Sequence, residues 1–582
     1  MRTHLKMTRR YAAALLLSLA PAIALAQAPP PDAAPSTGDA QALAVSAQHG
    51  MVVSQEARAS EVGVDILRRG GNAVDAAVAV GFALAVTLPR AGNLGGGGFM
   101  VVHLARQAKP VAIDYRETAP AAIRSDTFLN EKGDADPNKS LNSGLAVGVP
   151  GTVAGLALAH ARYGSGKFSF AELIAPAIRM ARAGVTVNED LFDTLQMSAR
   201  RLQRWSPKSA FFRPDGTPLE LGDTLVQPDL AASLQAIADR GPAAFYQGPV
   251  AEKIVAAVRA AGGGMTTDDL KSYRAVEREA VRGTYRGYDI VSMPPPSSGG
   301  IHLIEMLNIL EGFPLGSFAA ESPEALHLMI EAMKFAYADR AEFLGDSDAI
   351  AVPTERLISK AYAASLRARI DPARARPALE IRAGSPATET GGNTTHFSVV
   401  DQFGNAVANT TTLNFNYGLG LVAAGTGILL NNELDDFSAK PGAPNAFGLV
   451  GGSANAPGPS KRPLSSMTPT IVLKNGKPVL VTGAPGGSRI ITTVLQIVVN
   501  AIDFQEGIAD AVAAPRVHHQ WQPDVVLIER GLPDATIQGL QVRGHTIRVG
   551  PVSGSAHSIA VTPKGLVGAA DARSRGALAA GY

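Results

Sequence analysis

The fold is decided between Gly391 and Asn414, where the sequence reads GGNTTHFSVVDQFGNAVANTTTLN. Residues 395–400 alternate in the manner of a β-strand, residues 401–405 carry turn-forming side chains, and residues 406–413 return as a second strand. The stretch therefore predicts an antiparallel β-hairpin that follows a flexible, glycine-containing segment.

The register of this hairpin places a threonine beside a second hydroxyl group. We expect Asp401 to face Ala406. In that register Thr394 lies opposite Leu413 and beside Thr412. A threonine hydroxyl is a poor nucleophile without an adjacent base, and a free N-terminal amine can act as that base. Cleavage just before this threonine would expose such an amine. Strand threonines are more often simple β-formers, so the spacing alone leaves both interpretations open.

Farther along the chain, a second hairpin leads into a glycine pair. Strand-like residues 470–473, an Asn-Gly turn at 475–476 and strand-like residues 478–482 predict this hairpin. Gly486 and Gly487 follow it, where a strand gives way to a helix. The N–H groups of such a pair are unpaired and lie at the positive end of the helix dipole. They suit an oxyanion hole for acyl transfer, although an ordinary strand-to-helix turn is the alternative.

The remaining elements are mainly helical patterns. Residues 52–71 predict a helix capped by Ser54, and residues 72–88 predict a second helix that is apolar on all sides and therefore buried. Other helices are predicted at 170–182, 228–239, 249–261, 301–310, 323–343 and, with Ser488 as cap, up to residue 501. Residues 384–393 resemble an exposed linker. Strands flanked by helices of this kind predict layered α/β packing.

Composition excludes several classes of chemistry. The 582 residues are 46% hydrophobic and 18% charged, which is typical of a soluble globular protein. The net charge of +2 gives no concentrated positive field for nucleic acid or a membrane surface. The chain has no cysteine, which excludes disulfides, a thiol nucleophile and thiolate metal ligands. Hydroxyl or carboxylate chemistry remains.

The N-terminus predicts export. Basic residues precede an apolar run at 11–25, which ends in the small residues of Ala24-Leu25-Ala26. Residues 1–26 therefore predict a cleavable signal peptide, and the Pro/Ala/Ser-rich residues 27–42 a disordered leader. The apolar run is shorter than the ~20 residues that a transmembrane helix needs, so an uncleaved anchor is the less favoured alternative. We expect a periplasmic or secreted protein with no stable membrane insertion after export.

Several motifs in one order resemble those of the γ-glutamyltransferases, from about residue 45 to the C-terminus. They are Asn93-Leu94-Gly95-Gly96-Gly97-Gly98-Phe99, Asp114-Tyr115-Arg116-Glu117-Thr118-Ala119-Pro120, Pro295-Pro296-Ser297-Ser298-Gly299-Gly300, Thr394-Thr395-His396-Phe397-Ser398-Val399, Asn431-Asn432-Glu433-Leu434-Asp435-Asp436-Phe437, Pro463-Leu464-Ser465-Ser466-Met467 and residues 483–489.

The resemblance implies a particular fold and a maturation step. The fold would be the four-layer αββα sandwich of the N-terminal nucleophile hydrolases. The precursor would cut itself between Asn393 and Thr394. A large subunit of residues 43–393 and a small subunit of residues 394–582 would then remain together as one intertwined domain, a heterodimer.

The resemblance also implies roles for individual residues. Thr394 would be the nucleophile, Thr412 its neighbouring hydroxyl, and Gly486 and Gly487 the oxyanion donors. The implied substrate-binding residues are Arg116, Ser465 and Ser466 for the α-carboxylate, and Asn414, Glu433 and Asp436 for the α-ammonium group.

The implied reaction is cleavage of glutathione and other γ-glutamyl compounds through a γ-glutamyl-enzyme, without metal or organic cofactor. Water, an amino acid or a dipeptide would accept the γ-glutamyl group. Two alternatives remain: a glutaryl (cephalosporin) acylase of the same fold, and a non-catalytic periplasmic protein that binds glutathione. A glutaryl group has no α-ammonium for Glu433 and Asp436, whose presence favours a γ-glutamyl substrate.

One position departs from the family pattern. A lid over the site is expected at residues 441–452, and Phe447 stands where relatives often carry a tyrosine that hydrogen-bonds the position of Asn414. We expect a looser lid.

Two other signals, a glycine run and a histidine pair, are discounted as ligand sites. Residues 95–98 lack the lysine of a phosphate loop, and adjacent histidines at 518–519 point to opposite sides of a strand, away from a shared metal.

Overall fold

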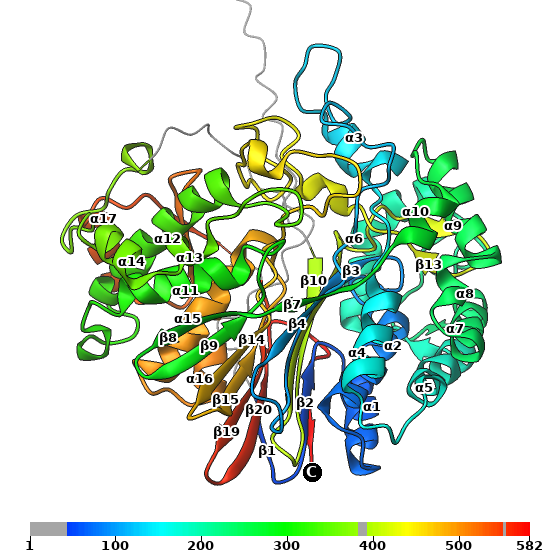
Figure 1. The fold of residues 1–582 in the computed structure, drawn as a ribbon, viewed down its shortest axis with the longest axis horizontal. Coiled ribbons are helices and arrows are strands. Elements are labelled where there is room, and N and C mark those ends of the chain that lie inside the picture. The colour runs from blue at the N-terminus through cyan, green and yellow to red at the C-terminus, as the bar shows by residue number, and fades with distance from the viewer. Residues whose placement is uncertain (1–42, 382–392, 551–553) are drawn as a thin grey trace, which may run out of the picture.

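The computed structural model describes residues 43–381, 393–550 and 554–582. Two seven-stranded antiparallel sheets face each other in the middle, and helices cover the outer face of each sheet (Figure 1). This arrangement confirms the predicted αββα sandwich. The predicted signal peptide, the leader and all but the last residue of the predicted linker lie outside the described residues.

Both sheets combine strands that precede residue 393 with strands that follow it. The first sheet has the order β1 (Leu43–Ala47), β20 (Gly565–Ala570), β19 (His557–Thr562), β15 (Lys477–Thr482), β14 (Thr470–Lys474), β9 (Tyr288–Ser292) and β8 (Val281–Tyr285). The second has the order β21 (Leu578–Gly581), β2 (Met51–Ser54), β10 (Asn393–Val400), β11 (Ala406–Asn414), β3 (Gly97–His103), β4 (Val111–Asp114) and β7 (Val276–Glu279). Neither part of the chain supplies a complete sheet alone.

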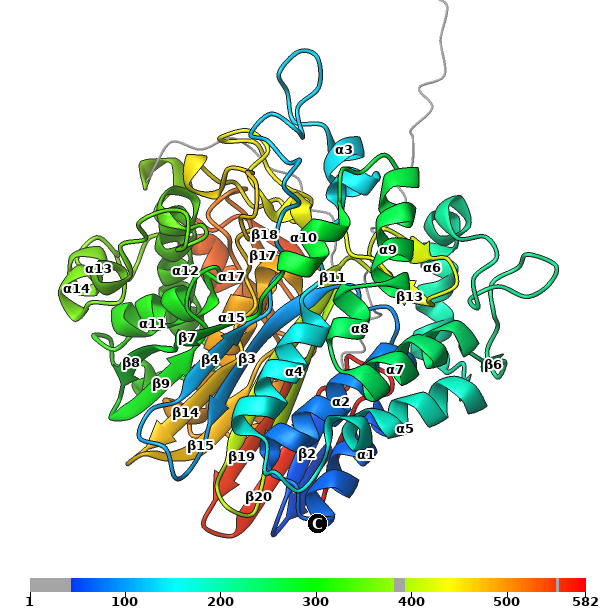
Figure 2. The same ribbon diagram turned by 45° about the vertical axis from the view of Figure 1, so that its right-hand side comes forward.

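The helices form the two outer layers, and those over the second sheet come forward in Figure 2. They are α1 (Ala57–Arg68), α2 (Ala73–Thr87), α4 (Thr152–Tyr163), α5 (Phe170–Ala183), α6 (Glu189–Trp205), α7 (Pro228–Arg240), α8 (Ala243–Tyr246), α9 (Pro249–Ala260) and α10 (Thr267–Ser272). The first sheet is covered by α11 (Gly299–Leu310), α12 (Pro323–Phe343), α13 (Thr354–Leu357), α14 (Lys360–Arg367), α15 (Ile490–Ile502), α16 (Ile508–Ala513) and α17 (Asp534–Val542). A short helix, α3 (Pro137–Leu141), and the small strands β5 (Val185–Thr186), β6 (Thr224–Leu225), β12 (Val422–Ala423), β13 (Ile428–Leu429), β16 (Val517–His518), β17 (Val526–Ile528) and β18 (Ile547–Val549) complete the described elements.

Apolar side chains fill the space between these layers. Between the sheets, Val53 and Val101 meet Ile471 and Val481 in one buried cluster. The helix α2 is buried at every position, as its largely apolar sequence predicts, and the side chain of Asn72 caps its first turn. The helices predicted at 170–182, 228–239, 249–261, 301–310 and 323–343 are confirmed as α5, α7, α9, α11 and α12. In the described part of the chain, no helix combines the length and apolarity needed to cross a membrane.

The first predicted helix begins later than expected. Residues 52–54 belong to the buried strand β2, which pairs with β10 and β21. The helix starts at Ala57, and the Glu56 side chain, not Ser54, accepts a hydrogen bond from its first turn. The four-residue strand is buried at every position, so it shows none of the alternation that would separate it from a helix.

The predicted register of the central hairpin is wrong by one residue. Thr394 pairs with Thr412, and Val400 pairs with Ala406. The cause lies in the turn, where the Asp401 carboxylate accepts hydrogen bonds from the backbone N–H groups of Phe403 and Asn405. These bonds keep Asp401 within the turn, because aspartate mimics a backbone turn, so the loop spans residues 401–405 and is one residue longer than expected. The second hairpin, β14 to β15, forms as predicted.

The expected helix cap at Ser488 is also wrong. Ser488 lies inside a short 3₁₀ turn, Gly487–Arg489, and α15 begins after it with no side-chain cap. The turn keeps the glycine pair at the very end of the strand-to-helix connection, where it faces the pocket described next.

Candidate active site

A pocket at one end of the sandwich collects the predicted residues from distant parts of the sequence. Its empty volume, including the part open to solvent, is about 280 Å³. It is lined by Arg116, Thr394, Thr412, Asn414, Glu433, Asp436, Phe447, Leu449, Ser465, Ser466, Met467, Gly487 and Ile490. Gly486 precedes the lining glycine directly, and only the backbone of Asn393 is described. The pocket therefore joins the ends of β10 and β11 to loops from both halves of the chain.

Thr394 begins the regular part of β10, directly after an irregularity in the pairing with β11. Its Oγ1 lies 3.3 Å from Oγ1 of Thr412, and both side chains are buried. The Thr412 hydroxyl also accepts a hydrogen bond from the backbone N–H of Asn414 at 2.8 Å. A bulge of this kind re-aims a side chain out of the sheet, and here it leaves one hydroxyl at the pocket floor next to another.

The glycine pair lies across the pocket from the strand ends. Gly486 has φ = 136° and Gly487 has φ = 57°, backbone conformations that favour glycine. A Cβ on Gly487 would lie 2.5 Å from the ring of Phe447. Within the described residues, no group accepts a hydrogen bond from either N–H. Two backbone donors are thus available at the pocket, as an oxyanion hole requires.

Arg116 is a fully buried cation with carboxylates around it. Its guanidinium donates to Glu433 and to Asp436, lies 3.8 Å from Glu117, and donates from Nε to the Pro463 carbonyl at 3.1 Å. Burial by itself lowers the pKa of Arg116, but the three carboxylates raise it overall. These charged groups hold one another in place.

The same burial acts on the acidic groups in the opposite direction. It raises the pKa of Glu433 and Asp436, against the lowering effect of Arg116. It also raises the pKa of Glu117 to about 7, and neither carboxylate oxygen of Glu117 has a hydrogen-bond partner among the described residues. Buried carboxylates that lack enough cationic partners favour a bound ammonium group.

Three further side chains complete the polar wall of the pocket. Ser465 accepts a hydrogen bond at Oγ from the Met467 N–H, and Ser466 accepts one from Arg340. Asn414 adopts φ = 76° and donates from Nδ2 to the Asn432 carbonyl at 2.9 Å. Serine hydroxyls that already accept keep their own hydrogens available for a ligand.

The lid segment is tied down by several contacts. Asn445 donates to Asp436 at 3.2 Å, and the backbone N–H of Ala446 donates to Asp435 at 3.0 Å. The ring of Phe447 stacks on Phe415 at a centroid distance of 5.7 Å. These contacts hold the lid over the pocket without the tyrosine hydroxyl whose absence the sequence indicated.

Some pocket residues were missed by the sequence analysis. The apolar residues Leu449, Met467 and Ile490 line the pocket, and their sequence gave no signal that separates them from ordinary core. Two charged residues lie just behind the lining: Glu117 beside Arg116, and Arg340 beside Ser466. Glu117 could have been found, because it stands next to Arg116 within a motif that was already selected.

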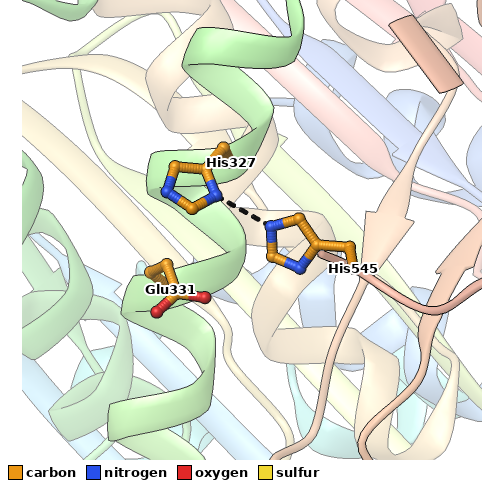
Figure 3. Close-up of side chains that lie close together, drawn as sticks. All are labelled: His327, Glu331 and His545. Carbon is orange, nitrogen blue, oxygen red and sulfur yellow. Dashed lines mark hydrogen bonds between the residues drawn. The ribbon is translucent and has the colours of Figure 1, made fainter. Parts of the chain in front are cut away.

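One cluster outside the pocket has residues of the kind that bind metals. His327 and Glu331 project from α12 toward His545 (Figure 3), and their potential ligand atoms lie within 4.8 Å of one another. The two rings are hydrogen-bonded to each other at 2.8 Å, and Lys334 donates to the Glu331 carboxylate at 2.9 Å. A divalent cation would have to lie beside this buried ammonium group. We interpret the cluster as a hydrogen-bonded network that joins α12 to the segment after α17.

The glycine run at 95–98 and the histidine pair at 518–519, which the sequence did not favour as a phosphate or a metal site, also have structural roles. Cβ atoms on the glycines at 95–98 would lie 2.0–2.5 Å from backbone oxygens, so these glycines allow close packing. His518 contacts Thr492, and His519 contacts Asp524, so the two histidines have different partners.

Comparisons with known proteins agree on one family. A family model described as Gamma-glutamyltranspeptidase matches residues 59–581. The chain is 52% identical over 576 residues to the glutathione hydrolase proenzyme of Escherichia coli (strain K12), with 99% of each chain covered. The structure resembles cephalosporin acylase from Bacillus halodurans, with a TM-score of 0.81, 28% identity, and 93% of this chain and 97% of that chain covered. It also resembles Helicobacter pylori gamma-glutamyltranspeptidase, with a TM-score of 0.55, 44% identity, and 56% of this chain and 93% of that chain covered.

Proposed function

This chain belongs to the γ-glutamyltranspeptidase family, and we propose that its pocket cleaves γ-glutamyl amides such as glutathione with Thr394 as the nucleophile. The observation that carries the assignment of roles is the presence in one pocket of a nucleophilic hydroxyl, unpaired backbone donors, and both cationic and anionic groups. A γ-glutamyl group needs all of these, because its far end is a zwitterion while its reacting end is an amide.

The proposed reaction has two steps. Oγ1 of Thr394 attacks the γ-carbonyl carbon, and its proton passes to the threonine amine that cleavage of the 393–394 bond exposes. The N–H groups of Gly486 and Gly487 stabilise the developing oxyanion. The C–N bond then breaks, the amine leaves with the proton, and an ester of Thr394 remains. Water or the amine of an amino acid or dipeptide attacks this ester and restores the hydroxyl.

Thr412 supports this step from the neighbouring strand. Its hydroxyl accepts the Asn414 N–H and lies within hydrogen-bonding distance of the nucleophile. The bond from Asn414 fixes the position of the Thr412 oxygen. We infer that Thr412 orients the Thr394 hydroxyl, both for the amide reaction and for the preceding self-cleavage.

The charged groups favour a γ-glutamyl over a glutaryl donor. Arg116, Ser465 and Ser466 offer hydrogen-bond donors to an α-carboxylate. Both substrates, the γ-glutamyl and the glutaryl compound, have such a carboxylate in equivalent form. Glu433 and Asp436 offer acceptors to an α-ammonium group, which only the γ-glutamyl donor has. A glutaryl group would leave both buried carboxylates to share Arg116 as their ion-pair partner, and an excess of buried negative charge is costly.

The test compares two anilides that differ only in the α-ammonium group. The purified, processed protein is expected to release aniline from the γ-glutamyl compound at least about 100-fold faster, in kcat/KM, than from the glutaryl compound. Equal rates, or a preference for the glutaryl compound, would move the protein to the acylase class. An uncut chain that binds glutathione and cleaves neither compound would support the binding-protein alternative.

Maturation and location follow from the same assignment. We propose that the precursor cuts itself between Asn393 and Thr394, into the segments 43–393 and 394–582, and that residues 1–26 direct export to the periplasm. The presence of strands from both segments in each sheet supports continued association of the two segments, because separating them would unpair β10 from β2 and β11 from β3.

The lid offers a test of how a missing hydroxyl affects catalysis. Phe447→Tyr is expected to lower the KM for the donor about two- to ten-fold, since one new hydrogen bond near Asn414 contributes about 0.5–1.5 kcal/mol. The ratio of transfer to hydrolysis should change with it, because a more firmly closed lid alters the access of water and acceptor. Initial rates with and without a dipeptide acceptor measure both. The matched control is Phe403→Tyr, the same substitution at an exposed turn position. If both variants behave like the unmodified protein, the lid has no missing latch.

A further inference from the structure

A second arginine lies behind Ser465 and Ser466, two of the residues that line the pocket. Arg340, near the end of α12, is 5% exposed. Its Nε donates to Oγ of Ser298 at 3.0 Å, and one terminal nitrogen donates to Oγ of Ser466 at 3.3 Å. Among the described residues, no carboxylate oxygen lies within 4.0 Å of its guanidinium nitrogens, the limit for an ion pair. A buried guanidinium without a carboxylate partner is costly, and it creates a site for an anion.

The contrast with Arg116 makes this position unusual. Arg116 is surrounded by carboxylates, which raise its pKa. The pKa of Arg340 is lowered, mainly by burial, and the more distant Asp436 only partly opposes this effect. The positive charge of Arg340 is therefore less well neutralised by the surrounding protein than the charge of Arg116.

The hydrogen bonds of Arg340 also fix the direction of two hydroxyls. Because Ser298 accepts from Arg340, its own O–H is free to donate, and it donates to the Ser465 carbonyl at 2.8 Å. Ser298 also donates its backbone N–H to the same carbonyl at 2.8 Å. Because Ser466 likewise accepts from Arg340, its O–H remains available toward the pocket that it lines.

We propose that Arg340 is a positioning residue for the α-carboxylate of the substrate, acting through Ser466 and, by way of Ser298, through Ser465. It turns the Ser466 hydroxyl into a donor, holds the backbone of Ser465 in place, and supplies positive charge behind both. The carboxylate then completes the ion pairing that Arg340 lacks within the protein. This inference rests on the proposed γ-glutamyl substrate and extends it by one residue outside the pocket lining.

A purely structural role makes a different prediction. If Arg340 only ties α12 to the neighbouring loops, its removal disturbs the whole pocket and weakens all ligands alike. If it positions the carboxylate-binding groups, its removal weakens only ligands that have an α-carboxylate or its equivalent. Three small molecules separate these cases: L-glutamate, glutarate, which lacks the ammonium group, and 4-aminobutanoate, which lacks the α-carboxylate.

The experiment is calorimetric titration of these three compounds into the processed protein and into Arg340→Gln. The variant is expected to bind L-glutamate and glutarate roughly ten- to hundred-fold more weakly, with the Kd for 4-aminobutanoate within about two-fold of the unmodified protein. Arg340→Lys retains the charge but cannot donate to both serines in one plane, so an intermediate loss is expected. Equal weakening of all three compounds, or no change, would overturn the proposal.

A matched pair of serine variants covers the case in which Arg340→Gln does not fold. Ser298→Ala removes the hydroxyl that links Arg340 to Ser465, whereas Ser297→Ala removes a neighbouring hydroxyl whose main acceptor is the Met467 carbonyl at 2.6 Å, with only a longer bond of 3.5 Å to the Ser465 carbonyl. The first is expected to weaken L-glutamate and glutarate several-fold more than the second. Identical behaviour of the pair would overturn the proposal. If the unmodified protein does not prefer L-glutamate over 4-aminobutanoate, the proposed function fails, and this inference with it.

Discussion

Thr394→Ala is expected to leave the polypeptide uncut and to lower amide cleavage by roughly 10⁴-fold or more, because the same hydroxyl serves both reactions. The oxyanion donors and the charged groups remain in this variant, so L-glutamate should still bind wherever the uncut linker leaves the pocket open. Denaturing mass spectrometry measures the cut, and release of aniline from the γ-glutamyl anilide measures the activity.

The neighbouring residue provides the control. Thr395 is buried on the opposite side of β10, and its hydroxyl has no hydrogen-bond partner among the described residues. Thr395→Ala is therefore expected to be cut and to retain activity within about three-fold, since it removes no satisfied polar contact. If Thr394→Ala is cut like Thr395→Ala, another residue is the nucleophile.

Asp436→Asn is expected to lower kcat/KM for the γ-glutamyl anilide about 100-fold. The substitution removes one of the two carboxylates that would hold the α-ammonium group, and losing one partner of a buried charge pair costs about 3 kcal/mol. The glutaryl anilide has no ammonium group, so its kcat/KM should fall much less. The quantity to measure is the ratio of the two kcat/KM values, which should collapse in this variant.

Asp435→Asn is the matched control, with the same change one residue earlier. Asp435 is buried, its pKa is raised to about 6 by that burial, and it accepts hydrogen bonds from Ser140 and from the Ala446 N–H of the lid. It does not line the pocket. Any loss should therefore be similar for both anilides. A selective loss in Asp435→Asn, or an unselective one in Asp436→Asn, would contradict the assigned ammonium site.

The sequence was sufficient for the elements with strong local signals. The helix α2 has an Asn cap and an apolar residue at nearly every position, and the hairpin of β14 and β15 has an Asn-Gly turn; both form as predicted. The register of β10 and β11 was missed, because one aspartate side chain lengthens the turn by one residue through bonds that the hydrophobic pattern does not show. The strand β2 was missed because a short, fully buried strand has no alternation.

The active-site assignment depended on the motifs and not on spacing. Arg116 and Glu433 are 317 residues apart, and nothing in periodicity or composition predicts that they meet. Only the resemblance to the family predicted that these two residues share one site. The resemblance gave no information about Arg340, which acts through hydrogen bonds to Ser298 and Ser466. Such an indirect role depends on which face of α12 meets which loop, and that is decided by the complete tertiary packing.

The edge strand β21 has a consequence for the two segments that the proposed cut would leave. The carbonyl of Tyr582 accepts hydrogen bonds from the N–H groups of Gln48 and His49, and β21 pairs with β2, the strand beside β10. The strand β2 thus lies between two strands that follow residue 393, β21 on one edge and β10 on the other. The proposed cut would therefore leave β2 paired on both edges with strands of the segment that follows it.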